Sequence, residues 1–281
     1  MARKTATQAG EAGGDDNANP PERVEALARG LAILKCFGRQ REYMTLSEIA
    51  EATMISRASA RRLLFTLVEL GYVEQNGRDF SLTSRVMELG YSFLVSMPWW
   101  EIATPHMRRI SDALNETCVA SVLLEKEVVM VARTSGSHFT AINMPMGTHL
   151  PAHATAMGRV LLASMLQDEL ARYLESVEPV RMTDYTIVDR DELASKIEQA
   201  RSDGYALVNE ELELGLRTIA VPLHDSEGTA IAAIAVSVYA PRVSEKDLEE
   251  KALPLLLQSA NEISRSLPLA GSIEKRRPPA R

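Results

Sequence analysis

Three stretches near the start of the chain carry apolar residues at the spacing of one helix face. They are residues 24–37, 46–52 and 57–70. Thr45 and Glu48 form a capping box ahead of the second stretch. Ser56 is an N-cap candidate for the third stretch, and Gly71 marks its end. The pattern therefore predicts a helix, a short helix, a tight turn and a third helix.

Two short strands are predicted after the third helix, Tyr72–Glu74 and Phe80–Leu82. Between them, Asn76-Gly77 is a strong signal for a hairpin turn. Helix, short helix, turn, helix and hairpin, in this order, make a winged helix-turn-helix. A further helix is expected over Ser84–Val95, which leads out of this domain and ends before Pro98.

Helical and strand-like segments succeed one another through the rest of the chain, which predicts an α+β domain with a central antiparallel sheet. Helices are expected at Pro105–Glu116, Met157–Ser164, Asp168–Glu175, Asp191–Asp203 and Glu245–Ser266. Strands are expected at Thr117–Leu124, Val128–Arg133, Phe139–Met144, Tyr205–Val208, Thr218–Leu223 and Ile231–Val238. The pair Trp99-Trp100 most simply covers a domain or subunit junction.

The predicted organisation has five parts. They are a disordered tail (1–22), a winged helix-turn-helix domain (23–83), a linker helix (84–98), a larger domain (99–268) and a disordered basic tail (269–281). The net charge of −7 is unevenly distributed, because residues 23–90 carry +2 and residues 91–270 carry −10. The positive part coincides with the helix-turn-helix, and phosphates respond to such a local field.

Composition and motifs exclude several classes of protein. With 46 % hydrophobic and 25 % charged residues the chain is an ordinary globular one, and it has no membrane-spanning run and no secretory signal. Cys36 and Cys118 cannot form a disulfide framework or a four-ligand zinc site, so a cytoplasmic location is expected. Pro151 separates His149 from His153, so no metal site is expected. No cofactor motif appears.

Hydroxyl and guanidinium groups cluster at the start of the third helix, opposite its apolar face. They belong to Ser56, Arg57, Ser59, Arg61 and Arg62. Arginine reads guanine edges, and a helix of this kind lies in the major groove of DNA. Thr45 and Arg78, the latter at the hairpin tip, complete the predicted DNA-contacting set. A solvated charged face is the alternative, but the order of cap, turn and hairpin favours DNA binding.

A helix also begins within the segment LPAHATAMGR (150–159), where Thr155 is an N-cap candidate. The first-turn N–H groups of Ala156, Met157 and Gly158 would attract a carboxylate or phosphate. The alternative, that Gly and Ala only permit tight packing here, has equal weight.

A third polar segment contains Glu210, Glu211 and Arg217. We interpret it as a structural Glu–Arg pair that holds a loop, in preference to a polar site. Cys118 lies in an apolar run and is interpreted as a buried small residue, not as a nucleophile.

Four segments resemble the IclR family of bacterial transcriptional regulators. They are ALARGLAILKCF (26–37), TLSEIAEATMISRASARRLLFTLVELGYV (45–73), LPAHATAMGRVLLA (150–163) and EELELGLRTIAVP (210–222). Within the family, the ALARGLAIL opening and the MELGYSFL linker look closest to the PcaR/PcaU/PobR group. That group governs catabolism of protocatechuate, 4-hydroxybenzoate and related aromatic acids.

The resemblance implies a winged helix-turn-helix, a linker helix that helps dimerisation, and a GAF-like effector domain. It implies a homodimer or dimer of dimers that binds double-stranded operator DNA and has no catalytic activity. Implied effector contacts are the backbone at Ala156-Met157 and side chains at Thr218 and Ser237. At Ala235 a hydroxyl is lost, and Val208 stands where some relatives have an acid.

A pocket of reduced polarity suits an aromatic acid. Met144, Met146, Leu150 and Met157 are expected to supply apolar walls, and Arg133 either pairs with a carboxylate or forms an interdomain ion pair. The expected effector contacts are Arg133, Met146, Leu150, His153, Ala156, Met157, Gly158, Thr218 and Ser237. The alternatives are a regulator that senses another small organic acid, the same fold with a degenerate pocket, and an enzyme acting on an acidic metabolite. No nucleophile–base pair supports the enzyme.

Overall fold

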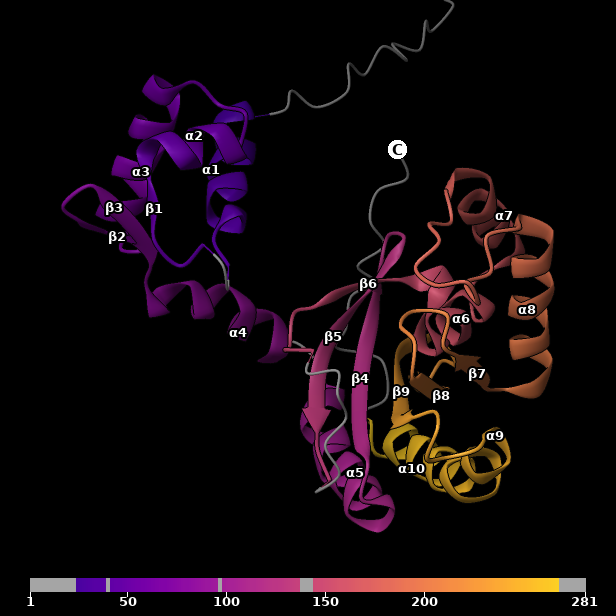
Figure 1. Cartoon of the computed structure of the whole chain (residues 1–281). Coiled ribbons are helices and arrows are strands. Elements are labelled where there is room, and N and C mark those ends of the chain that lie inside the picture. The colour runs from indigo at the N-terminus through magenta and orange to yellow at the C-terminus, as the bar shows by residue number, and fades with distance from the viewer. Residues whose placement is uncertain (1–23, 39–40, 96–97, 137–143, 268–281) are drawn as a thin grey trace, which may run out of the picture. The chain divides into compact units, whose positions relative to one another are not determined.

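The computed structural model describes residues 24–38, 41–95, 98–136 and 144–267. It divides into two compact units, residues 1–93 and 94–281 (Figure 1). The division falls within α4 (Met87–Val95), which follows a 3₁₀ turn at Ser84–Val86. The expected linker helix therefore starts with a tighter turn than α-helical spacing predicts. The expected tails, 1–22 and 269–281, lie outside the described residues.

In the described residues, the first unit contains three helices ahead of α4 and a small antiparallel sheet in the order β1-β3-β2. Its elements are α1 (Glu25–Cys36), β1 (Met44–Thr45), α2 (Leu46–Ala52), α3 (Arg57–Glu69), β2 (Val73–Asn76) and β3 (Asp79–Leu82). Ile33, Ile49 and Leu64 are fully buried and join the three helices in one core. The winged helix-turn-helix is thereby confirmed, and the two-residue strand β1 was not predicted.

Local signals set the element boundaries of this unit. The Thr45 hydroxyl accepts from the Glu48 N–H, and the Glu48 carboxylate accepts from the Thr45 N–H at 2.7 Å, which completes the expected capping box. Ser56 Oγ accepts from the Ser59 N–H at 3.3 Å and caps α3. Gly77 has φ +63, the left-handed conformation that a tight hairpin requires.

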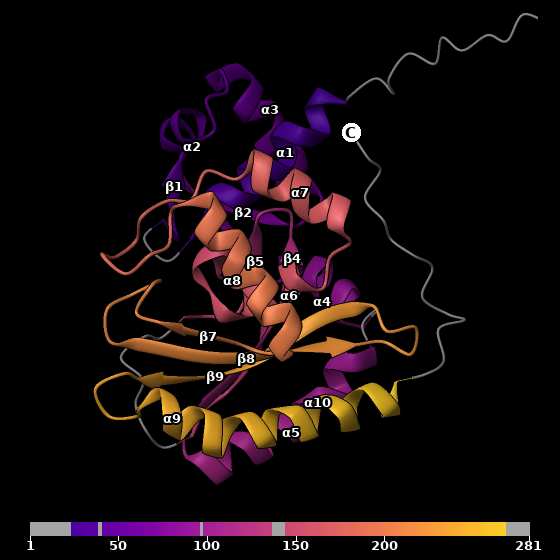
Figure 2. The same ribbon diagram turned by 90° about the vertical axis from the view of Figure 1, so that its right-hand side faces the viewer.

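The second unit is a six-stranded antiparallel sheet in the order β6-β5-β4-β9-β8-β7, with helices on both faces. The strands are β4 (Thr117–Leu124), β5 (Glu127–Thr134), β6 (His149–Pro151), β7 (Ala206–Asn209), β8 (Leu216–His224) and β9 (Ala230–Tyr239). The helices are α5 (Pro98–Leu114), α6 (Ala156–Ala163), α7 (Gln167–Ser176), α8 (Arg190–Asp203), α9 (Glu245–Asp247) and α10 (Leu253–Ser266). Figure 2 shows α6, α7 and α8 on one side of the strands, with α5 and α10 on the other.

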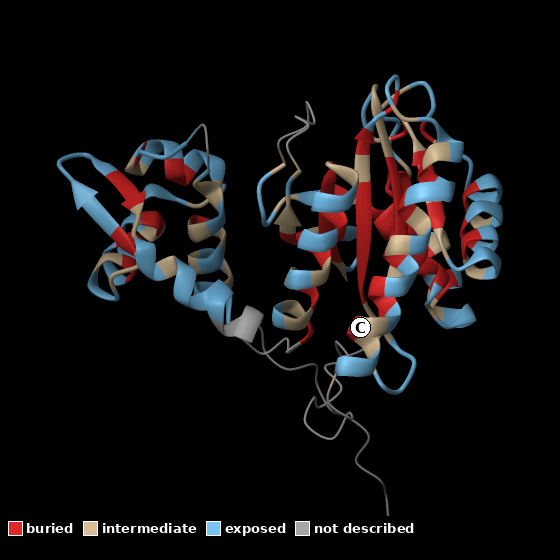
Figure 3. Ribbon diagram, turned by 90° about the horizontal axis from the view of Figure 1, so that it is seen from below, coloured by how far each residue is buried: buried red, intermediate tan, exposed pale blue. Residues whose placement is uncertain are grey.

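Two apolar layers, one on each face, hold this sheet. Figure 3 shows buried residues concentrated in the strands and exposed residues on the outer sides of the helices. Trp99 is 3 % exposed and packs in the same layer as Ala103 and Met107. The expectation that Trp99 covers a junction is wrong, because this side chain belongs to the unit's own core. Trp100 is partly buried against the same layer.

Helix α5 begins seven residues before the predicted start at Pro105, so this proline lies inside the helix. A proline removes one backbone hydrogen bond and normally ends or kinks a helix. Here the apolar side chains on both sides of Pro105 pack on one sheet face, and tertiary packing offsets the missing bond.

Other differences are smaller. β6 was not predicted, because a three-residue strand is too short to show alternation. Most of the expected strand Phe139–Met144 lies outside the described residues, and Met144 itself is not in a strand. The expected final helix is interrupted by a π-helical segment, Leu248–Ala252. In the described part of the chain, no helix is both long and apolar enough to cross a membrane.

Candidate functional site

The exposed face of α3 carries the arginines that the sequence assigned to DNA. Arg57, Arg61 and Arg62 are exposed, and Arg78 is exposed at the tip of the β2–β3 hairpin. None of the four forms an ion pair with another described residue. Their guanidinium groups are therefore open to phosphates or base edges.

The hydroxyl residues of this face are already engaged within the protein. Ser56 Oγ lies 3.1 Å from Ser59 Oγ and caps the helix, and the half-buried Thr45 hydroxyl hydrogen-bonds the Glu48 carboxylate at 2.8 Å. These three residues shape the start of α2 and α3, whereas the arginines supply the free charge.

A pocket lies in the second unit between the sheet and the start of α6, with about 580 Å³ of empty space when its solvent-open side is included. One row of paired residues crosses four strands and forms its floor. Val208 pairs with Thr218, Thr218 with Ser237, and Ser237 with Thr117. The Thr218 and Ser237 hydroxyls are 3.0 Å apart. The floor of the pocket therefore presents hydroxyl groups from three neighbouring strands.

The walls of this pocket are mostly apolar and include one cation. Arg133 reaches it from β5, and its Nη1 donates to the Met144 carbonyl at 3.4 Å. The complete lining is Thr117, Val119, Met130, Arg133, Met144, Leu150, Ala154, Thr155, Ala156, Met157, Val208, Leu212, Leu216, Thr218 and Ser237. An apolar enclosure with a few polar groups is typical of sites for small organic molecules.

The N-terminus of α6 opens into the pocket. Thr155 Oγ1 accepts from the Gly158 N–H at 3.1 Å, which caps the helix and occupies that donor. The N–H groups of Ala156 and Met157 have no hydrogen-bond partner among the described residues. Two oriented donors at a buried helix N-terminus favour an anionic group.

Six of the nine expected effector residues line the pocket: Arg133, Leu150, Ala156, Met157, Thr218 and Ser237. Three do not. Met146 is 60 % exposed outside it, and the buried His153 contacts the Val180 carbonyl through Nε2 at 3.1 Å. A Cβ on Gly158 would lie 2.1 Å from the Ala152 carbonyl oxygen, so Gly158 permits close packing, the alternative considered above.

Several lining residues were absent from the expected set: Thr117, Val119, Met130, Ala154, Leu212 and Leu216. Thr117 and Val119 alternate along β4 and therefore face one side of the sheet. That period was visible in the sequence. The pairing of β4 with β9, which places Thr117 beside Ser237, was not.

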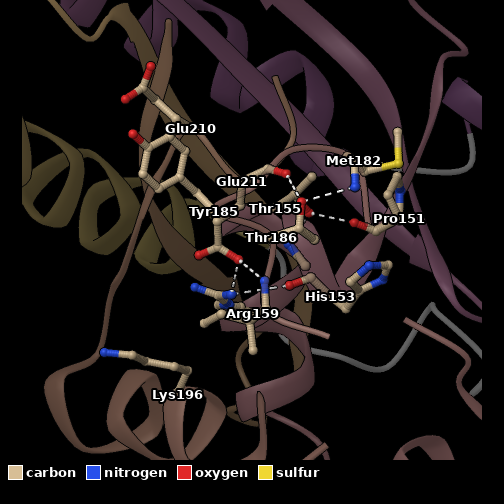
Figure 4. Close-up of polar contacts among 12 residues, drawn as sticks. Pro151, His153, Thr155, Arg159, Met182, Tyr185, Thr186, Lys196, Glu210 and Glu211 are labelled. Atoms are coloured by element: carbon tan, nitrogen blue, oxygen red, sulfur yellow. Dashed lines mark hydrogen bonds and ion pairs between the residues drawn. The ribbon is translucent and has the colours of Figure 1, made fainter. Parts of the chain in front are cut away.

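The acidic segment after β7 is structural, with partners different from the expected ones. Glu211 Oε2 lies 2.6 Å from Nη2 of Arg159 on α6, and both side chains are buried (Figure 4). The expected pairing with Arg217 is wrong, because Arg217 Nε donates to Asn209 Oδ1 at 2.9 Å. Glu210 accepts from the Gly215 N–H at 2.7 Å.

The remaining candidate groups have structural contacts. Burial raises the pKa of the Cys118 thiol to about 12, which leaves it a poor nucleophile. His149 Nδ1 lies 2.8 Å from Glu127 Oε2, and His153 is held at Val180. No group of three or more potential metal ligands occurs within the described part of the chain.

Comparison with known proteins agrees with both units. The family model described as the IclR helix-turn-helix domain matches residues 26–77, and the model for the bacterial transcriptional regulator IclR C-terminal domain matches residues 91–265. The Pca regulon regulatory protein of Pseudomonas putida is 37 % identical over 88 % of this chain and 85 % of its own length. The p-hydroxybenzoate hydroxylase transcriptional activator of Acinetobacter baylyi is 36 % identical over 85 % of this chain and 90 % of its own.

A solved structure extends the comparison to a ligand-bound protein. The IclR homolog of Microbacterium hydrocarbonoxydans complexed with 4-hydroxybenzoate superposes with a TM-score of 0.75. It is 26 % identical, over 85 % of this chain and 98 % of that one. The helix-turn-helix unit, the sheet domain and these matches together show that the chain belongs to the IclR family of bacterial transcriptional regulators.

Proposed function

We propose that this regulator binds operator DNA through residues 23–83 and a hydroxylated aromatic acid through residues 99–268, with residues 84–98 as the linker. The observation that carries the proposal is the pocket, which combines a cation, two free backbone donors and a row of hydroxyls within apolar walls. The regulated genes would then encode catabolism of an aromatic acid of the protocatechuate or 4-hydroxybenzoate type.

The chemistry of the lining favours an aromatic acid over a short oxoacid. Arg133 and the N–H groups of Ala156 and Met157 suit a carboxylate, and the Thr218–Ser237 pair suits a ring hydroxyl. Between these polar groups the walls consist of Met, Leu and Val side chains, which a benzene ring fills and a two-carbon acid does not. Two relatives that support this choice are the Acinetobacter activator, by its name, and the homolog bound to 4-hydroxybenzoate.

The DNA-binding assignment is supported by charge and exposure. Arg57, Arg61 and Arg62 project from α3 with no ion-pair partner among the described residues, and Arg78 lies at the hairpin tip. We assign α3 to the major groove and the hairpin to the flanking phosphates.

Exposed apolar side chains in the first unit support self-association. Leu27 on α1 is 65 % exposed, and Met87 on α4 is 72 % exposed. We propose a homodimer, or a dimer of such dimers, on a two-fold symmetric operator. Cys36 and Cys118 are both free thiols, in keeping with the reducing cytoplasm that we propose as its location.

Calorimetric titration of the full chain tests the effector assignment with 4-hydroxybenzoate, benzoate and pyruvate. We expect 4-hydroxybenzoate to bind most tightly and benzoate about tenfold more weakly, because benzoate cannot hydrogen-bond the hydroxyl pair. Pyruvate should give no measurable binding.

The variant Thr218→Val should remove most of the difference between the two benzoates, and Thr229→Val, in the β8–β9 turn, is the matched control. Failure of all aromatic acids to bind, or tighter binding of pyruvate, would contradict the proposal. The acid that binds should also change retention of a promoter fragment in a mobility-shift assay.

A further inference from the structure

One wall of the pocket is a loop that a buried ion pair ties to α6. The loop covers residues 210–215, between β7 and β8, and it contributes Leu212 to the pocket lining just before Leu216. Arg159 Nη2 and Glu211 Oε2 are 2.6 Å apart, with only 4 % and 8 % of the two side chains exposed. Since α6 also carries the pocket donors at Ala156 and Met157, this pair joins two elements that line the same pocket.

The segment that precedes α8 also anchors the loop, through hydrogen bonds to Glu210 and Glu211. Glu211 Oε2 accepts from the Ile187 N–H at 3.3 Å, and Thr186 Oγ1 donates to the Glu211 carbonyl at 2.6 Å. Thr183 Oγ1 donates to the Glu210 carbonyl, also at 2.6 Å. Figure 4 shows Thr186 at the main-chain oxygen of Glu211 and Arg159 at its carboxylate. The Glu211 side chain is the member of this network that reaches α6.

The backbone of the loop does not adopt this shape by its own preference. Glu210 has φ +56, a left-handed conformation that non-glycine residues seldom adopt. Such conformations persist where the surrounding structure holds them, and they are frequent at binding sites. The position of Leu212 therefore depends on the anchors at Glu210 and Glu211.

Arg159 has few other hydrogen-bond partners among the described residues that could replace Glu211. Arg159 Nη2 also donates to the His153 carbonyl, at 3.4 Å, whereas Nε has no partner among the described residues. The buried hydroxyl of Tyr173 likewise has none in that part of the chain. Removal of Glu211 alone would leave the buried Arg159 guanidinium without a counter-charge. The cost of that unpaired charge would fall if the loop moved and let water reach the guanidinium.

We propose that Arg159 and Glu211 are positioning residues that hold the Leu212 wall at the separation from α6 that an aromatic acid requires. This inference rests on the proposed effector site, and it adds that affinity for the acid depends on a pair that does not itself line the pocket. A pair that only stabilised the fold would be replaceable by apolar side chains of similar size without loss of binding.

Four variants of the full chain distinguish a positioning role from a purely stabilising one. They are Glu211→Ala, Glu211→Gln, the double variant Arg159→Met/Glu211→Leu and Glu213→Ala. The last is the control, because it removes an exposed charge from the same loop. For 4-hydroxybenzoate we expect about tenfold weaker binding in Glu211→Ala and in the double variant. Glu211→Gln keeps the acceptor but removes the counter-charge, so its affinity should lie between that of Glu211→Ala and that of the unchanged protein. Glu213→Ala should not differ.

Thermal unfolding and amide hydrogen exchange complete the test. The double variant should melt close to the unchanged protein while residues 210–216 exchange faster and β9 exchanges at its original rate. Full binding by the double variant, or by Glu211→Ala, would overturn the inference. If the unchanged protein binds no aromatic acid, the proposed function fails. Hydrogen exchange then decides the role of the pair, and an unaltered rate in residues 210–216 refutes it.

Discussion

The N-termini of α3 and α6 begin with the same local device and end in opposite environments. Each follows a hydroxyl cap, Ser56 or Thr155, whose oxygen accepts from the N–H three residues on, at 3.3 and 3.1 Å. All eight residues of α6 are buried, whereas in α3 only three residues of 13 are buried.

Burial, more than the cap, therefore decides which kind of partner the N-terminus of a helix can bind. The exposed start of α3 carries arginines and is accessible to a polymer as large as duplex DNA. The buried start of α6 carries Ala, Met and Gly, and its two N–H groups without a partner among the described residues adjoin a pocket of a size for a small molecule. Three predictions test this contrast, from the largest expected effect to the smallest.

At the exposed helix, the double variant Arg57→Ala/Arg62→Ala should abolish specific retention of operator DNA in a mobility-shift assay. Each guanidinium that reads a base contributes about 1–3 kcal/mol, so the expected loss of affinity in the double variant is about 30-fold or more. Arg172→Ala, an exposed arginine on α7, is the matched control and should bind as before. Unchanged retention in the double variant would exclude α3 as the reading helix.

At the buried helix, Gly158→Ala should reduce stability, because the new Cβ meets the backbone of Ala152 at 2.1 Å. We expect the free energy of unfolding of the second unit to fall by about 3 kcal/mol. Trp99 and Trp100 both lie in this unit, so tryptophan fluorescence during urea unfolding measures the change.

The comparison variant is Gly30→Ala in α1, where an added Cβ meets nothing within 4 Å. It should raise the free energy of unfolding of the first unit by about 0.5–1 kcal/mol, because alanine has a higher helix propensity than glycine. Unfolding monitored by circular dichroism measures this change. Equal effects at both glycines would contradict the packing assigned to Gly158.

A smaller, pH-dependent effect is expected from His153, which precedes α6. Burial lowers its pKa from 6.5, and nearby Arg159 adds to this, while the Val180 carbonyl opposes it. The unfolded chain therefore takes up a proton at a higher pH than the folded chain. Stability should fall as the pH drops through 6.5 and level off below the folded pKa.

The variant His153→Gln should flatten this dependence in part, as measured by urea unfolding at a series of pH values. His106 and His224, whose pKa values burial also lowers, should account for the remaining slope. An unaltered slope would mean that His153 is not buried in its neutral form.

Much of the architecture follows from local patterns that the sequence carries by itself. The capping box at Thr45, the cap at Ser56 and the Asn76-Gly77 hairpin each involve residues within a few positions of one another. Contacts of that range depend on little besides the local residues, so the helix-turn-helix, the hairpin and the exposed arginines could be predicted. Strand β4 was likewise predicted with its observed boundaries.

Only the tertiary structure decided features that depend on partners far away in the sequence. Packing on the sheet stabilises α5 as a helix on both sides of Pro105. Arg159 and Glu211 are 52 positions apart, and because both are buried at the same place, Glu211 pairs with Arg159 and not with Arg217. The same holds for the pocket floor, because the pairing of β4 with β9 brings Thr117 to Ser237. Side-chain identity gives the chemistry of these residues, but strand order and burial decide which of them meet.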